Sequence, residues 1–186
     1  MSRDVMIETE RLRLLPLTRQ QAEHVVVGNR DGQTWTAGYP RADDQDVARL
    51  FLTHDPGGEP LFGPLQIVDR HTGLVIGGIG FFWPPDADGK VEFGYGVAPE
   101  VEGRGYATEA LRALLAWAFG TGRVRRAVAD TMPHNVASQR VMEKAGMRRI
   151  ATPERLCYYE ITELEMINAG PAGTWRLGDL ASTGVG

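Results

Sequence analysis

One stretch of the sequence has residue types and spacing that suit the binding of a phosphate. It runs over residues 97–110 as Val-Ala-Pro-Glu-Val-Glu-Gly-Arg-Gly-Tyr-Ala-Thr-Glu-Ala, from a predicted strand through a glycine turn into an amphipathic helix. The first amide N–H groups of a helix lack intrahelical partners, and the helix dipole adds partial positive charge there. Gly103 and Gly105 let an anion approach without an intervening Cβ, and Arg104 can add a charge-assisted contact. We therefore predict an anion site over residues 103–108.

Two plainer interpretations compete with this anion site. Glycines before a helix can form an ordinary tight turn, and a lone G-x-G pattern is weak evidence. A dinucleotide-binding fingerprint of the G-x-G-x-x-G type would need glycine at position 108, where the chain has Thr108. A nucleotide-dependent oxidoreductase is therefore disfavoured, and the surrounding segments must separate a phosphate cradle from a simple turn.

Hydrophobic periodicity predicts the elements that would position this turn. Strands are expected at residues 10–14, 65–68, 74–82, 91–97, 126–131, 147–151 and 156–162. Helices are expected from the capping box of Thr18 and Gln21 to Val26, from Asp43 or Asp44 to His54, from about Gly105 to a stop at Gly120, and from Asn135 to Ala145. The order indicates an α/β (α+β) fold in which antiparallel strands lead into a strand-helix-strand unit.

Two glycines interrupt one of these strands. Gly94 and Gly96 lie inside the strand predicted at residues 91–97. Glycine in a strand interior indicates either a bulge or a close approach by another group.

Composition restricts the class of protein. A chain of 186 residues that is 42% hydrophobic can bury one continuous core, and its formal net charge of −4 argues against nucleic acid as a partner. Cys157 is the single cysteine and the four histidines are scattered, so we expect neither a disulfide nor a metal site. The N-terminus lacks a signal-peptide core, and the longest apolar run, Ala113–Phe119, is too short to span a bilayer. We expect a cytoplasmic location without membrane association.

The chain is expected to form one domain over residues 1–166, followed by a weakly ordered tail over residues 167–186. The tail is mostly small and polar. Its exceptions are Trp175, Leu177 and Leu180, which could dock on the domain or on a second subunit. A homodimer is therefore left open.

Four segments, in order, resemble the GNAT superfamily of acyl-CoA-dependent N-acetyltransferases. Residues 102–107 resemble the turn of its motif A, R/Q-x-x-G-x-G/A, and residues 135–147 resemble its N-x-x-S-x-x-x-x-E-K-x-G-F segment. Residues 91–95 match its E-x-G-Y strand. Residues 10–14 are similar to the T-E-R-L-x-L opening of the branch that includes ribosomal-protein N-terminal (alanine/serine) acetyltransferases. The resemblance covers nearly everything from Ile7 to Thr162.

The chain departs from the family pattern at two places. Acidic Glu100 and Glu102 flank the position of the family's Gln or Arg before the glycine turn. Met147 replaces the usual Phe, which is a substitution that a core tolerates in volume. The first departure concerns phosphate binding, and the second concerns packing alone.

The resemblance implies a GNAT-like fold with a mixed, mostly antiparallel central sheet, splayed between its fourth and fifth strands and covered by helices on both faces. Acetyl-CoA would lie in that opening as a cosubstrate, without a metal. The implied activity is direct transfer of an acetyl group, in a ternary complex, to a primary amine such as a protein N-terminus or a small-molecule amine. The alternative is a non-catalytic acyl-CoA-binding sensor or interaction module of the same fold.

The resemblance also implies roles for individual residues. Glu92 would take the proton of the attacking amine, directly or through water. Ser138 would protonate the departing CoA thiolate, with Tyr158 or Tyr159 as the other candidates. Acetyl-CoA would be bound by residues of the strand, the turn and the downstream helix: Tyr95, Val97, Gly103, Arg104, Gly105, Tyr106, Ala107, Thr108 and Asn135.

Each catalytic assignment has a structural alternative. Most strand glutamates are simply solvated, a serine in a first helical turn can cap the helix together with Asn135, and strand tyrosines usually pack. Cys157 could form an acetyl-cysteine, but no histidine lies near it in the sequence to lower its pKa.

The acceptor amine is left open by the sequence. Loops with aromatic and acidic side chains are expected to border its site, and their acidity would suit a cationic amine. The residues concerned are Trp35, Tyr39, Trp83, Asp86 and Asp88.

Overall fold

The computed structural model describes residues 6–54, 58–150 and 155–168. In this part of the chain eight strands form one sheet in the order β1-β2-β3-β4-β5-β6-β8-β7, and every neighbouring pair is antiparallel except β5 and β6. The strands are β1 (Ile7–Glu8), β2 (Leu12–Pro16), β3 (Pro64–Asp69), β4 (Val75–Phe81), β5 (Lys90–Val97), β6 (Arg126–Thr131), β7 (Arg148–Arg149) and β8 (Cys157–Thr162).

The parallel pair at the centre of the sheet is short. Residues 90–92 of β5 pair with residues 126–128 of β6, and the ladder ends there. Antiparallel pairing of β5 with β4 continues to Val97. The edge of β5 from Phe93 onward therefore has no ladder partner on the β6 side. This confirms the predicted mixed, mostly antiparallel sheet and its splay, although β1 makes the splayed strands the fifth and sixth.

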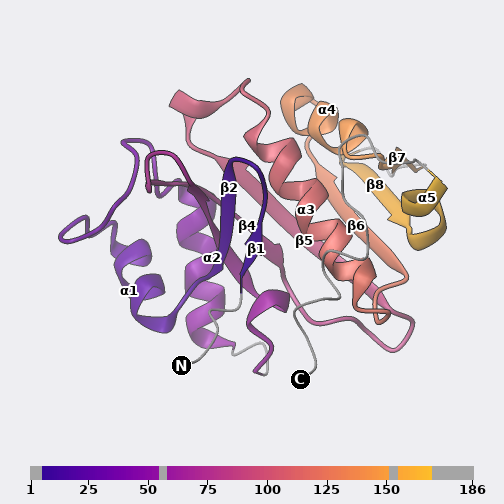
Figure 1. The fold of residues 1–186 in the computed structure, drawn as a ribbon, viewed down its shortest axis with the longest axis horizontal. Coiled ribbons are helices and arrows are strands. Elements are labelled where there is room, and N and C mark those ends of the chain that lie inside the picture. Colours follow the sequence, from indigo (N-terminus) through magenta and orange to yellow (C-terminus); the bar gives the residue numbers. More distant parts are fainter. Residues whose placement is uncertain (1–5, 55–57, 151–154, 169–186) are drawn as a thin grey trace.

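Helices cover both faces of the sheet. They are α1 (Arg19–Val27), α2 (Ala42–Thr53), α3 (Tyr106–Gly120), α4 (Val136–Lys144) and the short α5 (Glu163–Asn168), with 3-10 turns at Pro60–Phe62 and Pro99–Val101. Figure 1 shows α1 and α2 at one end of the molecule and α4 and α5 at the other. None of the helices in the described ranges combines the length and apolar character needed to cross a bilayer.

Local sequence signals explain where most helices begin. Thr18 accepts a hydrogen bond from the amide of Gln21, whose side chain bonds back to the Thr18 amide, as the capping box predicts. Helix α2 begins at Ala42, one or two residues before the predicted start, because Asp44 accepts the Arg41 amide. The unpredicted α5 has the same kind of signal, since Glu165 accepts from the backbone and hydroxyl of Thr162.

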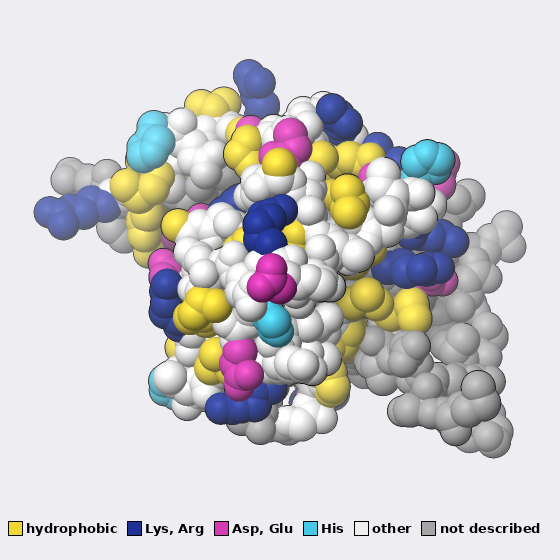
Figure 2. Space-filling view, turned by 90° about the vertical axis from the view of Figure 1, so that its left-hand side faces the viewer, with side chains coloured by type: hydrophobic (Ala, Val, Ile, Leu, Met, Phe, Trp, Pro, Cys, Tyr) yellow, Lys and Arg dark blue, Asp and Glu magenta, His cyan; other side chains and the backbone are white. Residues whose placement is uncertain are grey.

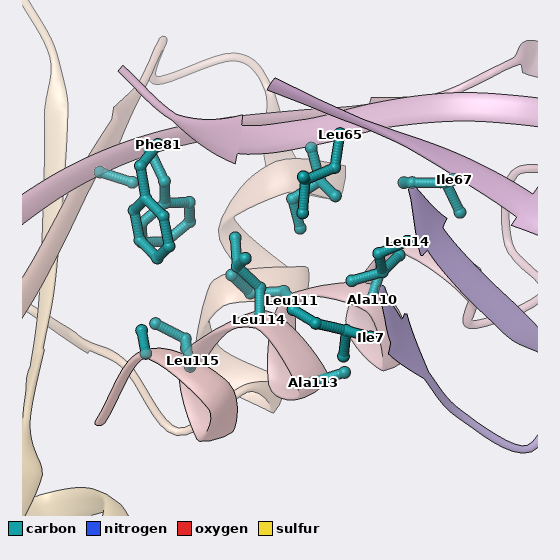
Figure 3. Packing of buried hydrophobic residues seen from close by; sticks show 14 of the residues in the cluster. Ile7, Leu14, Leu65, Ile67, Phe81, Ala110, Leu111, Ala113, Leu114 and Leu115 are labelled. Carbon is teal, nitrogen blue, oxygen red and sulfur yellow. The ribbon is translucent and has the colours of Figure 1, made fainter. Parts of the chain in front are cut away.

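The main core lies between α3 and the sheet. Leu14, Leu65, Ile67 and Phe81 point from strands β2 to β4 toward α3 (Figure 3). The apolar stripe predicted for α3 is fully buried at four positions, namely Leu111, Leu114, Leu115 and Ala118. Helix α3 is therefore held against the sheet along its length, and its N-terminus is fixed beside the end of β5.

The boundary between domain and tail is only partly described. Helix α5 continues to Asn168, past the predicted domain end at residue 166. Residues 169–186, with the predicted docking residues Trp175, Leu177 and Leu180, lie outside the described residues.

Candidate active site

The N-terminus of α3 presents backbone amides that have no hydrogen-bond partner among the described residues. Gly105 is the N-cap and has no side-chain cap, and the helical ladder starts with the Glu109 amide donating to the Gly105 carbonyl at 3.0 Å. No hydrogen-bond acceptor occurs for the amides of residues 103–108 within the described part of the chain. Helices α1 and α4 differ, because Thr18 and Asn135 accept first-turn amides there. Helix α2 also has no side-chain cap, but its first turn carries the acidic Asp43 and Asp44, which oppose the binding of an anion. Among these four helices, α3 is thus the one whose N-terminus best suits an external anion.

The space above this turn is open. Gly103 and Gly105 have φ angles of 72° and 81°, a backbone conformation that favours glycine. A Cβ at Gly103 would meet no heavy atom within 4 Å, and one at Gly105 would meet only the Arg11 guanidinium at 3.5 Å. The two glycines therefore leave an open backbone surface, which we call the cradle (residues 103–108).

Two polar groups of the cradle form hydrogen bonds with other residues of the protein. The Tyr106 hydroxyl donates to the Asp69 carboxylate at 3.2 Å, and the Arg104 carbonyl accepts from Arg11 at 3.0 Å. The Arg104 side chain is exposed and has no hydrogen bond or ion pair within the described residues. Of these residues, Arg104 is therefore free to meet an anion, whereas the Tyr106 hydroxyl supports the fold.

Glu100, which departs from the family pattern, points away from the cradle. Its carboxylate accepts the Gly38 amide at 2.7 Å and the Thr36 hydroxyl at 2.8 Å. The Gly38 amide, followed by further hydrogen bonds including that of Thr36, lowers the pKa of Glu100 below its ordinary value. The acidic side chain is therefore used to fasten the loop before α2, and its charge is bound to that loop.

The splay between β5 and β6 is bridged by one side-chain contact. The Tyr95 hydroxyl lies 2.9 Å from the Ser138 hydroxyl and donates to the Ser138 carbonyl at 3.0 Å. Asn135 caps α4 by accepting the Ser138 amide at 3.1 Å, which leaves the Ser138 hydroxyl to Tyr95. Burial raises the pKa of Tyr95 to about 12, although the Ser138 hydrogen bond lowers it. Tyr95 is therefore a protonated donor at neutral pH.

Alternation along the strands divides the predicted catalytic residues between two faces. Tyr95 and Tyr159 both bond to residues of α4, so both point to the face that α4 covers. Glu92 and Tyr158 lie an odd number of residues away and point to the opposite face. The structure therefore brings Ser138 together with Tyr95, whereas Glu92 and Tyr158 lie on the other side of the sheet.

That opposite face, which α2 covers, holds a pocket of about 240 Å³. Glycines pair directly across β4 and β5 beneath it, Gly78 with Gly96 and Gly80 with Gly94, without a shift in register. Because these positions lack side chains, Arg41, Asp44 and Phe82 can approach the strands closely and form part of the pocket wall. The lining is mainly apolar and includes Leu17, Val47, Pro64 and Phe82 beside Tyr39, Arg41, Asp43, Asp44 and Gln66. Leu65, Ile79, Phe81 and Tyr95 also border the pocket, although their side chains point to the opposite face of the sheet.

An ion pair closes one end of this pocket. Arg41 donates to both carboxylate oxygens of Asp44, at 2.9 and 2.7 Å, and Asp44 is only 8% exposed. A Cβ on Gly96 would collide with the Arg41 guanidinium. A bulge is therefore absent from this part of β5, and the second interpretation of the strand glycines, close approach by another group, is confirmed.

The remaining predicted site residues lie around these features. Glu92 is exposed and belongs to the short paired segment of β5, outside the pocket lining. Val97 is buried at the end of β5. Ala107 and Thr108 are half-buried in the first turn of α3, and their amides belong to the cradle. Cys157 is buried and free.

The loops expected near an acceptor divide into two groups. Tyr39 lines the pocket, and Trp83 borders a small adjoining hollow, where its ring meets His54 edge-on at 6.0 Å. Asp86 instead accepts the backbone amides of Asp88 and Lys90, so it shapes the turn before β5. Trp35 is buried and packs edge-on against Tyr39.

Several pocket residues have no signal in the sequence motifs. Arg41, Asp44 and Gln66 come from separate segments, and only the fold brings them together. Asp130 is exposed opposite Tyr158 in the β6–β8 pair, just beyond the end of the parallel ladder. The glycine spacing in β4 and β5 was the one available clue to the pocket.

The surface around α1 and α2 has no dominant character. In Figure 2, basic, acidic and hydrophobic side chains are interspersed over the face turned to the viewer. Within the described ranges, no three His, Cys, Asp or Glu side chains cluster as they would around a metal ion. The features that stand out chemically are therefore the cradle, the splay and the pocket.

Known proteins share this architecture. Residues 11–148 match the family described as the acetyltransferase (GNAT) domain. The chain is 29% identical to the uncharacterized N-acetyltransferase YjdG of Bacillus subtilis over 150 residues, which are 76% of this chain and 89% of that protein. A GNAT-family acetyltransferase structure from Bacillus anthracis has a TM-score of 0.63 at 25% identity, covering 86% of this chain and 99% of that one. Ribosomal-protein-S5-alanine acetyltransferase from Vibrio fischeri has a TM-score of 0.64 at 18% identity, covering 86% and 97%.

The burial of Tyr95 predicts that its hydroxyl titrates at unusually high pH. Burial raises the pKa of Tyr95 from 10.0 to about 12, so the folded protein favours the neutral phenol. The stabilisation from this group is fully present below about pH 10 and is lost as the pH rises toward 12. In a ¹³Cζ-tyrosine NMR titration, the resonance that Tyr95→Phe removes should ionise last or nearly last. A midpoint near pH 10 for that resonance would contradict the burial of the Tyr95 hydroxyl.

Proposed function

The chain belongs to the GNAT acetyltransferase family, and on this premise we propose that it transfers the acetyl group of acetyl-CoA to a primary amine, directly, in a ternary complex. The observation that carries the proposal is the cradle, whose amides at residues 103–108 have no acceptor within the described residues. They lie where β5 ends and its outer edge is unpaired. A diphosphate on the cradle would leave the attached pantetheine chain beside that edge.

The unpaired edge of β5 supplies the next component of the reaction. Backbone N–H groups fixed there can donate to the thioester carbonyl oxygen as it becomes negative during attack. The free amine adds to the carbonyl carbon, the tetrahedral intermediate collapses, and the C–S bond breaks to give the amide and the CoA thiolate. This requires one proton to leave the amine and one to reach the sulfur.

Proton donors and acceptors are proposed on opposite faces of the sheet. Tyr95 and Ser138 form a hydroxyl pair on the α4 side, and we assign them to protonate the thiolate. Glu92 is exposed on the α2 side, and we assign it to take the amine proton, directly or through water. Tyr158 points to the same side as Glu92, so it is the less suitable donor to the sulfur.

The pocket under α2 is the proposed site of the acceptor. It borders β5, the strand to which we assign the binding of the thioester, and its lining is mainly apolar with the Arg41–Asp44 ion pair at one end. Such a site suits an amine that carries a compact apolar group. One structural neighbour is named for acetylation of alanine on ribosomal protein S5, so peptide N-termini belong in an acceptor screen beside small amines.

A pair of glycine substitutions tests the cradle. Gly103 and Gly122 have φ angles of 72° and 68°, and a Cβ at either position would meet no heavy atom within 4 Å. Gly103→Ala and Gly122→Ala should therefore cost about the same in stability, roughly 1 kcal/mol, but only the first places a methyl group on the cradle. Calorimetry should show a CoA affinity lowered about tenfold or more in Gly103→Ala and nearly unchanged in Gly122→Ala. Equal affinities in the two folded variants would remove the cradle as the diphosphate site.

The assignment of Glu92 predicts a selective loss of turnover. With an amine identified by thiol release from acetyl-CoA, Glu92→Gln should lower kcat by about 100-fold while leaving CoA affinity unchanged, because the lost group acts only on the amine proton. Asp130→Asn is the control, since Asp130 is a second exposed carboxylate on a neighbouring strand. If Asp130→Asn abolishes turnover and Glu92→Gln does not, the base has been assigned to the wrong carboxylate.

A further inference from the structure

A carboxylate lies within the first turn of the helix that carries the cradle. Glu109 belongs to α3, and its side chain is 18% exposed. An unpaired negative charge at this position would stabilise the isolated helix but would repel a diphosphate that uses the same dipole. The cradle can serve an anion well only if this charge is compensated.

Arg11, 98 residues earlier in the sequence, supplies that compensation. Its Nε and Nη2 each lie 2.6 Å from the Glu109 Oε2 atom. The Arg11 amide and the Thr9 hydroxyl donate to Oε1, at 3.0 and 2.6 Å. Burial alone raises the pKa of Glu109, but the hydrogen bonds from Thr9 and Arg11 outweigh it and hold the pKa below its ordinary value.

The same guanidinium also touches the cradle. Arg11 Nη1 donates to the Arg104 carbonyl at 3.0 Å, and the guanidinium lies over the Tyr106 ring at 4.5 Å from its centre. The carbonyl of the turn is thereby held on the protein side, toward Arg11. Because β1, β2 and the packed length of α3 fix both partners, the pair is preorganised before any ligand arrives.

We propose that Arg11 is a positioning residue for the coenzyme: it cancels the charge of Glu109 and so keeps the α3 N-terminus attractive to a diphosphate. This inference rests on the proposed function and assigns a role to two residues, Thr9 and Arg11, that the sequence motif alone does not explain. Arg11 acts through Glu109, and the diphosphate itself is bound by the backbone amides of the cradle.

The neighbouring strand position offers a matched control. Arg13 lies in β2, two residues after Arg11, and also forms an ion pair, with Glu8 at 2.8 Å across the β1–β2 pair. The side chains of Arg13 and Glu8 are both about half exposed, and their ion pair does not involve the cradle. Arg13→Met therefore removes the same charge and an arginine–glutamate ion pair without affecting Glu109.

The experiment measures CoA affinity by calorimetry in five proteins: the unmodified chain, Arg13→Met, Arg11→Met, Glu109→Gln, and Arg11→Met combined with Glu109→Gln. We expect Arg11→Met to weaken CoA binding by about fivefold to tenfold, because it leaves Glu109 unpaired beside the cradle. Glu109→Gln and Arg13→Met should bind CoA nearly as the unmodified chain does. The double variant should recover most of the lost affinity, which a purely structural role of Arg11 would not produce.

The outcomes separate this inference from the proposed function. If the unmodified chain does not bind CoA, both fall. If it binds and Arg11→Met binds equally well, only the role of Arg11 falls. A double variant as weak as Arg11→Met would mean that Arg11 contacts the phosphates directly and would also overturn the proposal. Should Arg11→Met fail to fold, Arg11→Lys, which keeps the charge, is expected to retain affinity within about threefold, and a larger loss that Glu109→Gln does not restore counts against the inference.

Discussion

The candidate site depends on the early end of one parallel ladder. β5 and β6 pair over three residues and then separate, while β5 remains fixed by β4 as far as Val97. A sheet that stayed paired would have used the β5 backbone groups internally and left no opening beside the N-terminus of α3. Separation of one strand pair thus produces both a free row of backbone groups and an accessible helix start, and the rest of the fold holds them in place.

Successive side chains of β5 point to opposite faces of the sheet, so the two faces of this strand can serve different purposes. Side chains of β5 that point toward α4 include Tyr95, which reaches Ser138, whereas the positions facing α2 include Gly94 and Gly96. On that second face the missing side chains let Arg41 and Phe82 approach the strand closely, and both residues line the pocket. A coenzyme and an acceptor approaching β5 from different sides would therefore meet at the same backbone without competing for the same space.

Much of this could be predicted from local patterns. The capping box of Thr18, the glycine turn before α3 and the strand at residues 126–131 all rest on interactions within a few residues, and each is found as expected. Contacts between distant segments could not be predicted, because no periodicity reports them. The contacts of Tyr95 with Ser138 and of Arg11 with Glu109 join residues 43 and 98 positions apart. The catalytic and coenzyme-binding roles stay predictions, since they depend on contacts with acetyl-CoA and with an acceptor amine.

The most direct test of the account is a crystal structure of the protein with bound CoA. The account predicts that diphosphate oxygens accept hydrogen bonds from the amides of residues 103–108, with the pantetheine chain running along the unpaired edge of β5. A structure in which the diphosphate is bound elsewhere, while those amides face only solvent, would contradict it.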